Sequence, residues 1–123
     1  MQDKTMKPKY RFFDNFRYAR EGFLEVFKSE TSFKIEVVII AILSVTALFL
    51  PFPMWAKAVL IVGMFPVIIA ELLNSAIERV VDMYTKEYHP LAKYAKDAGA
   101  GAVMFSIAFS AGIWIAVILY FCS

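Results

Sequence analysis

Cysteine is nearly absent from this sequence of 123 residues, which contains only Cys122, next to its C-terminus. A single thiol excludes an internal disulfide and also any metal site built from a cluster of cysteines. Because the surrounding residues are apolar, we interpret Cys122 as a spectator thiol in a terminal helix. Any chemistry that the protein performs must therefore come from other residue types.

Several recognition signals are also missing. No apolar run of the cleavable type follows the N-terminal lysines within the first 30 residues, so we expect no secretory signal peptide. No nucleic-acid-binding module is visible, and nucleic acid is not an expected partner. The sequence contains neither a G-x-x-x-x-G-K-S/T loop nor a kinase-type glycine-rich loop, so we do not expect a soluble-kinase fold.

Charge is missing from the last 26 residues, Ala98–Ser123. The whole chain is 60% hydrophobic and has a mean hydropathy of +0.61, whereas soluble domains are usually about 45–50% apolar. We therefore predict an all-α integral membrane protein. Its length allows one domain, which would span residues 1–123.

Three apolar stretches are long enough to cross a bilayer as helices. We predict membrane spans at residues 35–50, 55–81 and 98–122. The P-F-P sequence at residues 51–53 should end the first span and turn the chain. Pro66 is expected to kink the second span about one turn before Glu71. The run A-G-A-G-A at residues 98–102 starts the third span with small side chains that permit close helix contact.

The charged residues before the first span indicate how the chain is oriented. Residues 11–29 alternate apolar and charged groups, which predicts an amphipathic helix on the membrane surface. Eight of the 13 Lys and Arg residues precede Val37, whereas the turn after the first span holds only Lys57. The positive-inside rule therefore places the N-terminus and the polar connection 82–97 in the cytoplasm, and the C-terminus outside.

Four polar side chains share one spacing inside the apolar sequence: Glu71, Asn74, Glu78 and Asp82. Steps of three, four and four residues put all of them on one face of an α-helix. An ionisable group at membrane depth costs several kcal/mol unless it faces protein, water, a metal or a partner. This face is therefore predicted to be a functional site.

Other charged residues should meet this face at the cytoplasmic interface. Two glutamates from different elements, such as Glu30 and Glu78, could hold a partly hydrated Mg²⁺ that also binds phosphate oxygens. Lys96 could neutralise phosphate charge as a compact cation. A partly desolvated Glu71 could act as a general base. These groups together suit phosphoryl transfer from a nucleotide to a lipid hydroxyl.

The spacing alone leaves three classes of protein open. The carboxylate face could belong to a phosphoryl-transfer enzyme or to a proton- or cation-coupled transporter. It could also be a polar face that only assembles an oligomer. ATP distinguishes these classes, because a carrier or scaffold would neither hydrolyse ATP nor label a lipid.

Three ordered motifs resemble signatures of the prokaryotic diacylglycerol kinase family, which also includes undecaprenol kinases. Residues 71–82 match the pattern E-x-x-N-S/T-A-I-E-x-x-V-D fully. Residues 89–97, with the G-A-G-A-V that follows, resemble a second signature, and residues 28–36 resemble a segment E-x-x-F-R/K-x-E. The resemblance covers the chain from about Arg11 onward. It implies a surface helix and three membrane spans in a homotrimer whose active sites are shared between subunits.

The resemblance also implies a reaction and a role for each site residue. ATP with Mg²⁺ would phosphorylate a lipid alcohol, with Glu71 as the base and with Glu30 and Glu78 as metal ligands. Nucleotide contacts are implied at Arg11, Tyr18, Glu87, His89, Lys96 and Asp97. Further active-site positions are Asn74 and Asp82, and positions on the lipid side are Lys34 and Glu36. Arginine is usual at Lys34, and lysine keeps the charge but lacks the bidentate fork.

Some of these residues have a second interpretation. His89, before Pro90, could be a solvated loop histidine, and Glu87 could be a surface charge. Asp97 could cap the N-terminus of the third span. Arg79, inside the first motif, is expected to pair with a carboxylate or to reach phosphate headgroups.

The resemblance leaves two lipid acceptors. Glu36 and residues 87–89 resemble the diacylglycerol kinase type, whereas residues 16–22, 89–93 and 100–103 resemble the undecaprenol kinase type. The former type would carry serine at Ala100 and tryptophan at Arg20. We favour diacylglycerol, with undecaprenol as the alternative, and we expect the protein in the bacterial cytoplasmic (inner) membrane.

Overall fold

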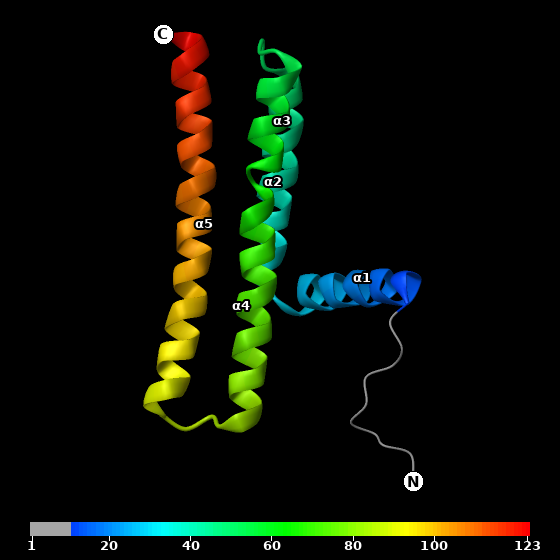
Figure 1. Ribbon diagram of the computed structural model, residues 1–123, viewed down its shortest axis with the longest axis vertical. Helices are drawn as coiled ribbons and strands as arrows, with labels where there is room; N and C mark the ends of the chain where they lie inside the picture. Colours follow the sequence, from blue (N-terminus) through cyan, green and yellow to red (C-terminus); the bar gives the residue numbers. More distant parts are fainter. Residues whose placement is uncertain (1–10) are drawn as a thin grey trace.

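The computed structural model describes residues 11–123, which form helices and no strands. The helices are α1 (Phe12–Ser29), α2 (Thr31–Phe49), α3 (Met54–Val62), α4 (Phe65–Tyr84) and α5 (Pro90–Cys122). Helices α2 and α5 run alongside the stacked pair α3 and α4, while α1 leaves the bundle at a steep angle (Figure 1). The polar N-terminal segment, residues 1–10, lies outside the described residues.

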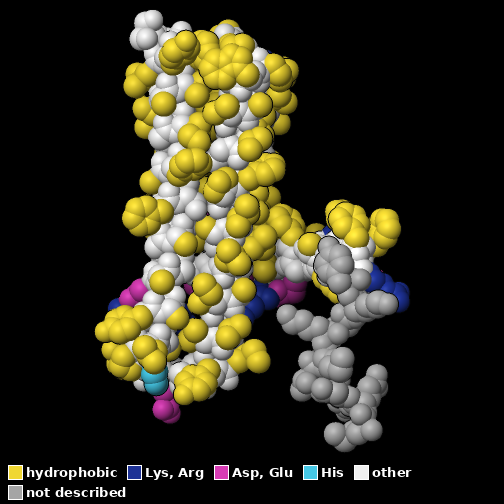
Figure 2. All heavy atoms as spheres, in the orientation of Figure 1, with side chains coloured by type: hydrophobic (Ala, Val, Ile, Leu, Met, Phe, Trp, Pro, Cys, Tyr) yellow, Lys and Arg dark blue, Asp and Glu magenta, His cyan; other side chains and the backbone are white. Residues whose placement is uncertain are grey.

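Three stretches are long and apolar enough to cross a membrane: Thr31–Phe49, Met54–Tyr84 and Pro90–Cys122. The chain is thus an all-α, multi-pass membrane protein, as its hydropathy predicted. On the face drawn in Figure 2, charged side chains gather at one end of the bundle and on α1, and the remainder of the bundle surface is apolar. Helix α1 is present where a surface helix was expected, and its placement on a membrane stays a prediction.

The second predicted span, residues 55–81, is two helices. Gly63 and Met64 separate α3 from α4, and the Gly63 N–H is bonded to the carbonyls of Ile61 and Val59. Pro66 lies in the first turn of α4, where its missing N–H would have had no partner within the helix. The break therefore lies about two turns before Glu71, not one turn before it as Pro66 alone suggested.

The third helix also begins earlier than the predicted span. Helix α5 starts at Pro90, so the connection from α4 is residues 85–89 and not the whole polar segment 82–97. The His89 side chain caps this helix by accepting a hydrogen bond from the Leu91 N–H (3.1 Å), and Pro90 supplies a helical φ at its first position. The polar residues that looked like a loop are therefore the first two turns of α5, and Asp97 is not the N-cap.

Small side chains bring the helices together. Ala47 of α2 and Ala56 of α3 are fully buried, and α2 and α3 are in contact. A Cβ on Gly63 would lie 2.9 Å from Ile113 Cδ1, so α5 approaches the α3–α4 break closely. At the other end of α2, buried Phe33 packs edge-on against Phe23 of α1, with ring centres 5.3 Å apart. This contact sets the corner from which α1 departs.

Candidate active site at the charged end of the bundle

Helix α4 is the central element of the site. It carries Glu71, Asn74 and Glu78, all half-buried, and Asp82, which is exposed one turn further on. Asn74 Nδ2 donates a hydrogen bond to Glu78 Oε1 (3.2 Å). The two are four residues apart on one helix, so the predicted shared face is realised as a contact.

Helix α5 packs against part of this face of α4, and Gly99 lies at the point of contact. A Cβ at Gly99 would lie only 2.3 Å from Asn74 Oδ1, so no other residue fits there without a shift of the backbone or of Asn74. Asn74 Oδ1 is buried and has no hydrogen-bond partner among the described residues. The close approach of α5 thus holds the Asn74 amide in the orientation that reaches Glu78.

Glu30 reaches α4 from the corner between α1 and α2. Its backbone is extended (φ −119°, ψ 112°), which separates the two helices by one residue. Ser75 Oγ, which is buried, donates to Glu30 Oε1 (2.9 Å), and Arg79 donates to Glu30 Oε2 (3.1 Å). Both carboxylate oxygens of Glu30 are therefore held by side chains of α4.

A second carboxylate of this corner lies beside Glu71. Glu36, on the first turns of α2, is the direct neighbour of the Glu71 carboxyl, and Glu30 is near enough for its charge to act on Glu71. Glu36 Oε2 is buried and accepts no hydrogen bond from residues 11–123. Carboxylates this close repel each other unless they share a proton or a cation. The cluster is therefore suited to exchange a proton with a substrate.

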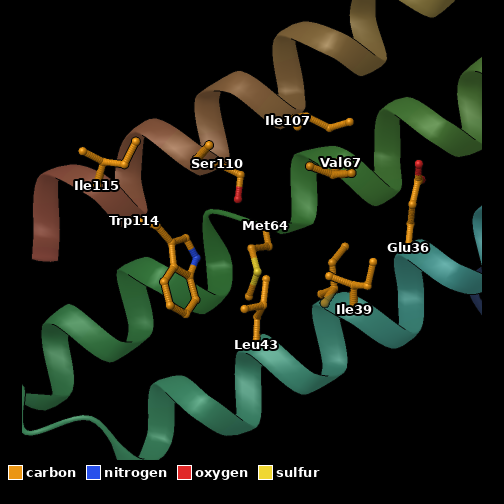
Figure 3. Close-up of a pocket in the computed structure, with 11 residues that line it drawn as sticks. Glu36, Ile39, Leu43, Met64, Val67, Ile107, Ser110, Trp114 and Ile115 are labelled. Carbon is orange, nitrogen blue, oxygen red and sulfur yellow. The ribbon is translucent and has the colours of Figure 1, made fainter.

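An apolar pocket of about 490 Å³ lies between α2, α4 and α5, and Glu36 is the one residue of this cluster that lines it. Glu36 lies at one end of it with its carboxyl toward α4, and Trp114 and Ile115 lie at the other end (Figure 3). The walls between them are almost entirely hydrocarbon. A hydrocarbon chain in this pocket would have its polar end at the carboxylates.

Arg79 joins α4 to α1. Its guanidinium pairs with Glu25 and Glu30 and donates to Ser29 Oγ (2.9 Å), which confirms the expectation that Arg79 pairs with a carboxylate. The hydrogen bond from Arg79 is the main cause that lowers the pKa of Glu25 from its ordinary value. Glu25 and Ser29 are four residues apart and so lie on one face of α1.

A separate polar pocket, lined by Val81, residues 85–89 and the first turns of α5, lies between the end of α4 and the start of α5, and we call it the mouth of the site. Lys96 Nζ donates to Asp82 Oδ1 (2.7 Å), and Lys93 Nζ donates to Asp97 Oδ2 (2.5 Å). The pocket has a volume of about 400 Å³. Four of the predicted nucleotide contacts line this pocket: Glu87, His89, Lys96 and Asp97.

The other two predicted nucleotide contacts do not line this pocket, and neither does Lys34, which was predicted on the lipid side. Arg11 precedes α1 and Tyr18 lies on it; both are exposed, and Tyr18 contacts the Arg17 guanidinium at 5.3 Å from the ring centre. Lys34 is exposed on α2, 5.6 Å from the centre of the Phe27 ring. Figure 1 shows α1 projecting from the bundle on the side away from α5.

The donor set suits a magnesium ion that a nucleotide helps to hold. Residues 11–123 contain no group of three or more His, Cys, Asp or Glu side chains placed to hold a metal. Mg²⁺ in nucleotide sites usually takes one or two carboxylates and fills the rest of its octahedron with phosphate and water. Glu30 has one hydrogen bond on each oxygen, which leaves lone pairs for an ion. Glu30 therefore fits such a partial ligand set, and the role of Glu78 beside it stays a prediction.

Sequence reasoning missed three residues of the site: Ser75, Glu25 and Ser29. Ser75 lies inside the first motif, one position after Asn74, and its small polar side chain inside an apolar helix was the available signal. The spacing of Glu25 and Ser29 was visible too, but nothing local to α1 indicates that their partner is Arg79.

Comparison with known proteins connects this geometry to a family. Residues 17–118 match the family described as prokaryotic diacylglycerol kinase. The chain is 35% identical to a diacylglycerol kinase of Pseudomonas aeruginosa over 102 residues, which are 83% of each chain. It is 33% identical to a diacylglycerol kinase of Helicobacter pylori strain J99 over 118 residues (93% of this chain, 92% of the relative). It is also 38% identical to an undecaprenol kinase of Bacillus subtilis over 96 residues, 76% of each chain.

Proposed function

This chain belongs to the prokaryotic diacylglycerol kinase family, and we propose from that premise that it transfers the γ-phosphate of ATP to the hydroxyl of diacylglycerol. The observation that carries the proposal is the position of the carboxylate pair Glu36 and Glu71. Glu36 lines the polar end of an apolar pocket, and Glu71 lies beside Glu36 and near Glu30, which α4 holds in place. A lipid in the pocket would present its hydroxyl to a base and to a phosphate-binding group.

Glu71 is the proposed base. The lipid hydroxyl gives its proton to the Glu71 carboxylate while its oxygen forms a bond to the γ-phosphorus, and the bond from that phosphorus to the β–γ bridging oxygen breaks. ADP leaves with the electrons of the broken bond. Glu36 lies directly beside the Glu71 carboxyl and lines the pocket, so the pocket leads to the proposed base.

Glu30 and Glu78 are the proposed ligands of the Mg²⁺ that accompanies ATP. The ion, when bound, supplies positive charge to the β- and γ-phosphates. Lys96 would add a second cation, and it faces Asp82 and Glu78 at the mouth of the site. The mouth pocket would take the nucleotide, with Glu87, His89 and Asp97 in contact with it.

A complete site would need a second copy of the chain. Arg11, Tyr18 and Lys34 lie on or beside the projecting α1, away from the mouth of the same chain. In a homotrimer, α1 of one subunit can approach the mouth of its neighbour. We place the N-terminus and the α4–α5 connection on the cytoplasmic side of the inner membrane, since ATP is available there.

Undecaprenol is the second candidate acceptor. The observation that favours it is the 38% identity to the Bacillus subtilis undecaprenol kinase, which is similar to the identities of the diacylglycerol kinases. Each acceptor has one free hydroxyl at the polar end of long hydrocarbon chains, so both suit the pocket at Glu36. The catalytic assignments are the same for either lipid.

The test is transfer of labelled γ-phosphate from ATP-Mg by the purified chain in mixed micelles. Diacylglycerol and undecaprenol are offered separately and then in competition. Preferential labelling of diacylglycerol supports the proposal, and preferential labelling of undecaprenol replaces the acceptor but keeps the site. If folded protein labels neither lipid, the phosphotransferase proposal fails.

A further inference from the structure

We propose that Arg79 is a positioning residue that sets the orientation of Glu30 and fixes the end of α1 to α4. The affinity of the site for its metal-bound nucleotide would then depend on a side chain that does not touch either. This inference rests on the proposed role of Glu30 as a metal ligand. It concerns a residue to which neither the resemblance nor the comparisons assign a role.

The geometry joins three groups of the α1–α2 corner through one guanidinium. One terminal nitrogen of Arg79 contacts Glu25, and the other donates to Ser29 Oγ (2.9 Å) and to Glu30 Oε2 (3.1 Å). Ser75, one turn earlier on α4, holds the other oxygen of Glu30 at 2.9 Å. The Glu30 carboxylate is therefore fixed at both oxygens, and both donors come from the helix that carries Glu71 and Glu78.

Only arginine suits this position. The guanidinium is planar and presents donors in two directions, so one nitrogen can serve Glu25 while the other serves Ser29 and Glu30. Lysine would provide a single point charge that cannot bridge the same groups with fixed angles. Arg79 also follows Glu78 directly, so the same turn of α4 carries one proposed ligand and the residue that orients the other.

The charges around Glu30 show why an orienting cation matters. Glu71 lies near enough to Glu30 for their charges to interact, and Glu36 adjoins Glu71. Without Arg79, Ser75 alone would hold Glu30 against the repulsion of these carboxylates. Arg79 takes only one lone pair of Oε2 and leaves others for a metal ion. Removal of outer partners of metal ligands typically lowers metal affinity by about 10–100-fold.

The first measurement is the binding of a nonhydrolysable ATP analogue, as its Mn²⁺ complex, to the full chain in mixed micelles. Binding is monitored by the electron paramagnetic resonance signal of Mn²⁺. Arg79→Ala should weaken binding by about 10–100-fold and should raise the Mg²⁺ concentration needed for half-maximal lipid phosphorylation. Arg79→Lys should recover part of the loss. The matched control is Arg20→Ala, which removes the same charge from an exposed α1 residue that has no ion pair with the described residues.

A second readout follows α1 itself. Cys122 is the only cysteine of the chain, so Cys122→Ser with Gly22→Cys gives one labelling site, and a Cβ at Gly22 meets nothing within 4 Å. A spin label there should become more mobile in Arg79→Ala, and the helical content should not change. Greater mobility with unchanged Mn²⁺ binding would reduce Arg79 to a structural clamp and overturn the proposal.

Tighter Mn²⁺ binding in Arg79→Ala would also overturn the proposal, because it would mean that Arg79 competes with the ion for Glu30. The proposed function fails separately, if the unmodified chain labels no lipid. In that case the Mn²⁺ measurement and the label on α1 still report whether Arg79 orients Glu30.

Discussion

Different forces hold the helices together at the two ends of this bundle. Helix α5 runs along both ends, whereas α3 lies at the apolar end and α4 leads to the charged end (Figure 1). At the apolar end, Ala56 and Leu60 are fully buried and Gly63 lets α5 approach closely. At the charged end, contacts are made by hydrogen bonds and ion pairs such as Ser75–Glu30 and Lys96–Asp82. Lipid gives little hydrophobic drive to helix association, so the apolar end depends on close packing.

The difference teaches where a substitution should change stability and where it should change chemistry. Side chains at the apolar end act through shape, and swaps that keep volume are tolerated. At the charged end, side chains such as Glu30, Ser75 and Lys96 have identified partners, so the loss of one leaves another unsatisfied. Stability and activity should therefore separate along the length of the bundle.

The largest expected effect is at Glu71. Glu71→Gln keeps the size of the side chain but cannot accept the proton, so lipid phosphorylation should fall by about 10²–10⁴-fold. The measurement is labelled phosphate transfer by protein whose folding in micelles is checked by circular dichroism. Substantial remaining activity would remove Glu71 from the base role.

The next effect concerns the proposed metal ligands. Glu30→Gln or Glu78→Gln should raise the Mg²⁺ concentration for half-maximal activity by about tenfold or more, because the amide is a weaker ligand and carries no charge. Glu21→Gln is the matched control, since Glu21 is exposed and, within residues 11–123, pairs only with Arg17 on its own helix. An unchanged Mg²⁺ titration in both variants would argue against these ligands.

A smaller effect should distinguish two glycines of α5. Gly99→Ala would place a Cβ 2.3 Å from Asn74 Oδ1, and such overpacking typically costs about 1–3 kcal/mol of stability. Activity should fall as well, because Asn74 must move away from Glu78. Gly101→Ala meets nothing within 4 Å and serves as the control. Equal thermal stability of the two variants would contradict the close contact between α4 and α5.

Gly63→Ala extends this comparison to the apolar end. There the new Cβ would lie 2.9 Å from Ile113 Cδ1, the far end of a flexible side chain, and 2.8 Å from the Val59 carbonyl oxygen. Stability should fall, but activity per folded molecule should fall less than in Gly99→Ala, because the new Cβ meets Val59 and Ile113 and no carboxylate of the site. A loss of activity without a loss of stability would contradict the expectation that the apolar end affects stability and the charged end affects activity.

The smallest effect is a pH dependence of α1. Arg79 holds the pKa of Glu25 below its usual range, so this pair is complete above the ordinary glutamate pKa of about 4.3 and is lost as the pH falls through the lowered value. A spin label at Gly22→Cys should therefore stay immobile to below that range, and Glu25→Gln should remove this transition. An increase in mobility between pH 7 and pH 5 would contradict the assignment.

Sequence alone predicts the parts of this structure that depend on local periodicity. Hydropathy located three helices able to span a membrane, and the spacing of Glu71, Asn74 and Glu78 put them on one face. The sequence predicts the break at Pro66, because proline is a strong local signal for a kink. The structure places the break at Gly63, and this glycine lets Ile113 of α5 approach, which no local pattern indicates. Partners such as Glu25 and Arg79 are 54 residues apart, and only the packing of α1 on α4 brings them together.

The break between α3 and α4 has a consequence for how the protein responds to its membrane. When the bilayer thickness changes, a continuous helix tilts along its whole length. Helix α3 is nine residues long, about 14 Å, and it lies on the far side of the break from the carboxylates. Hydrophobic mismatch can thus be absorbed by α3, while α4 keeps its register against Gly99. A protein whose reaction alters the lipids around it would keep its site geometry as the bilayer changes.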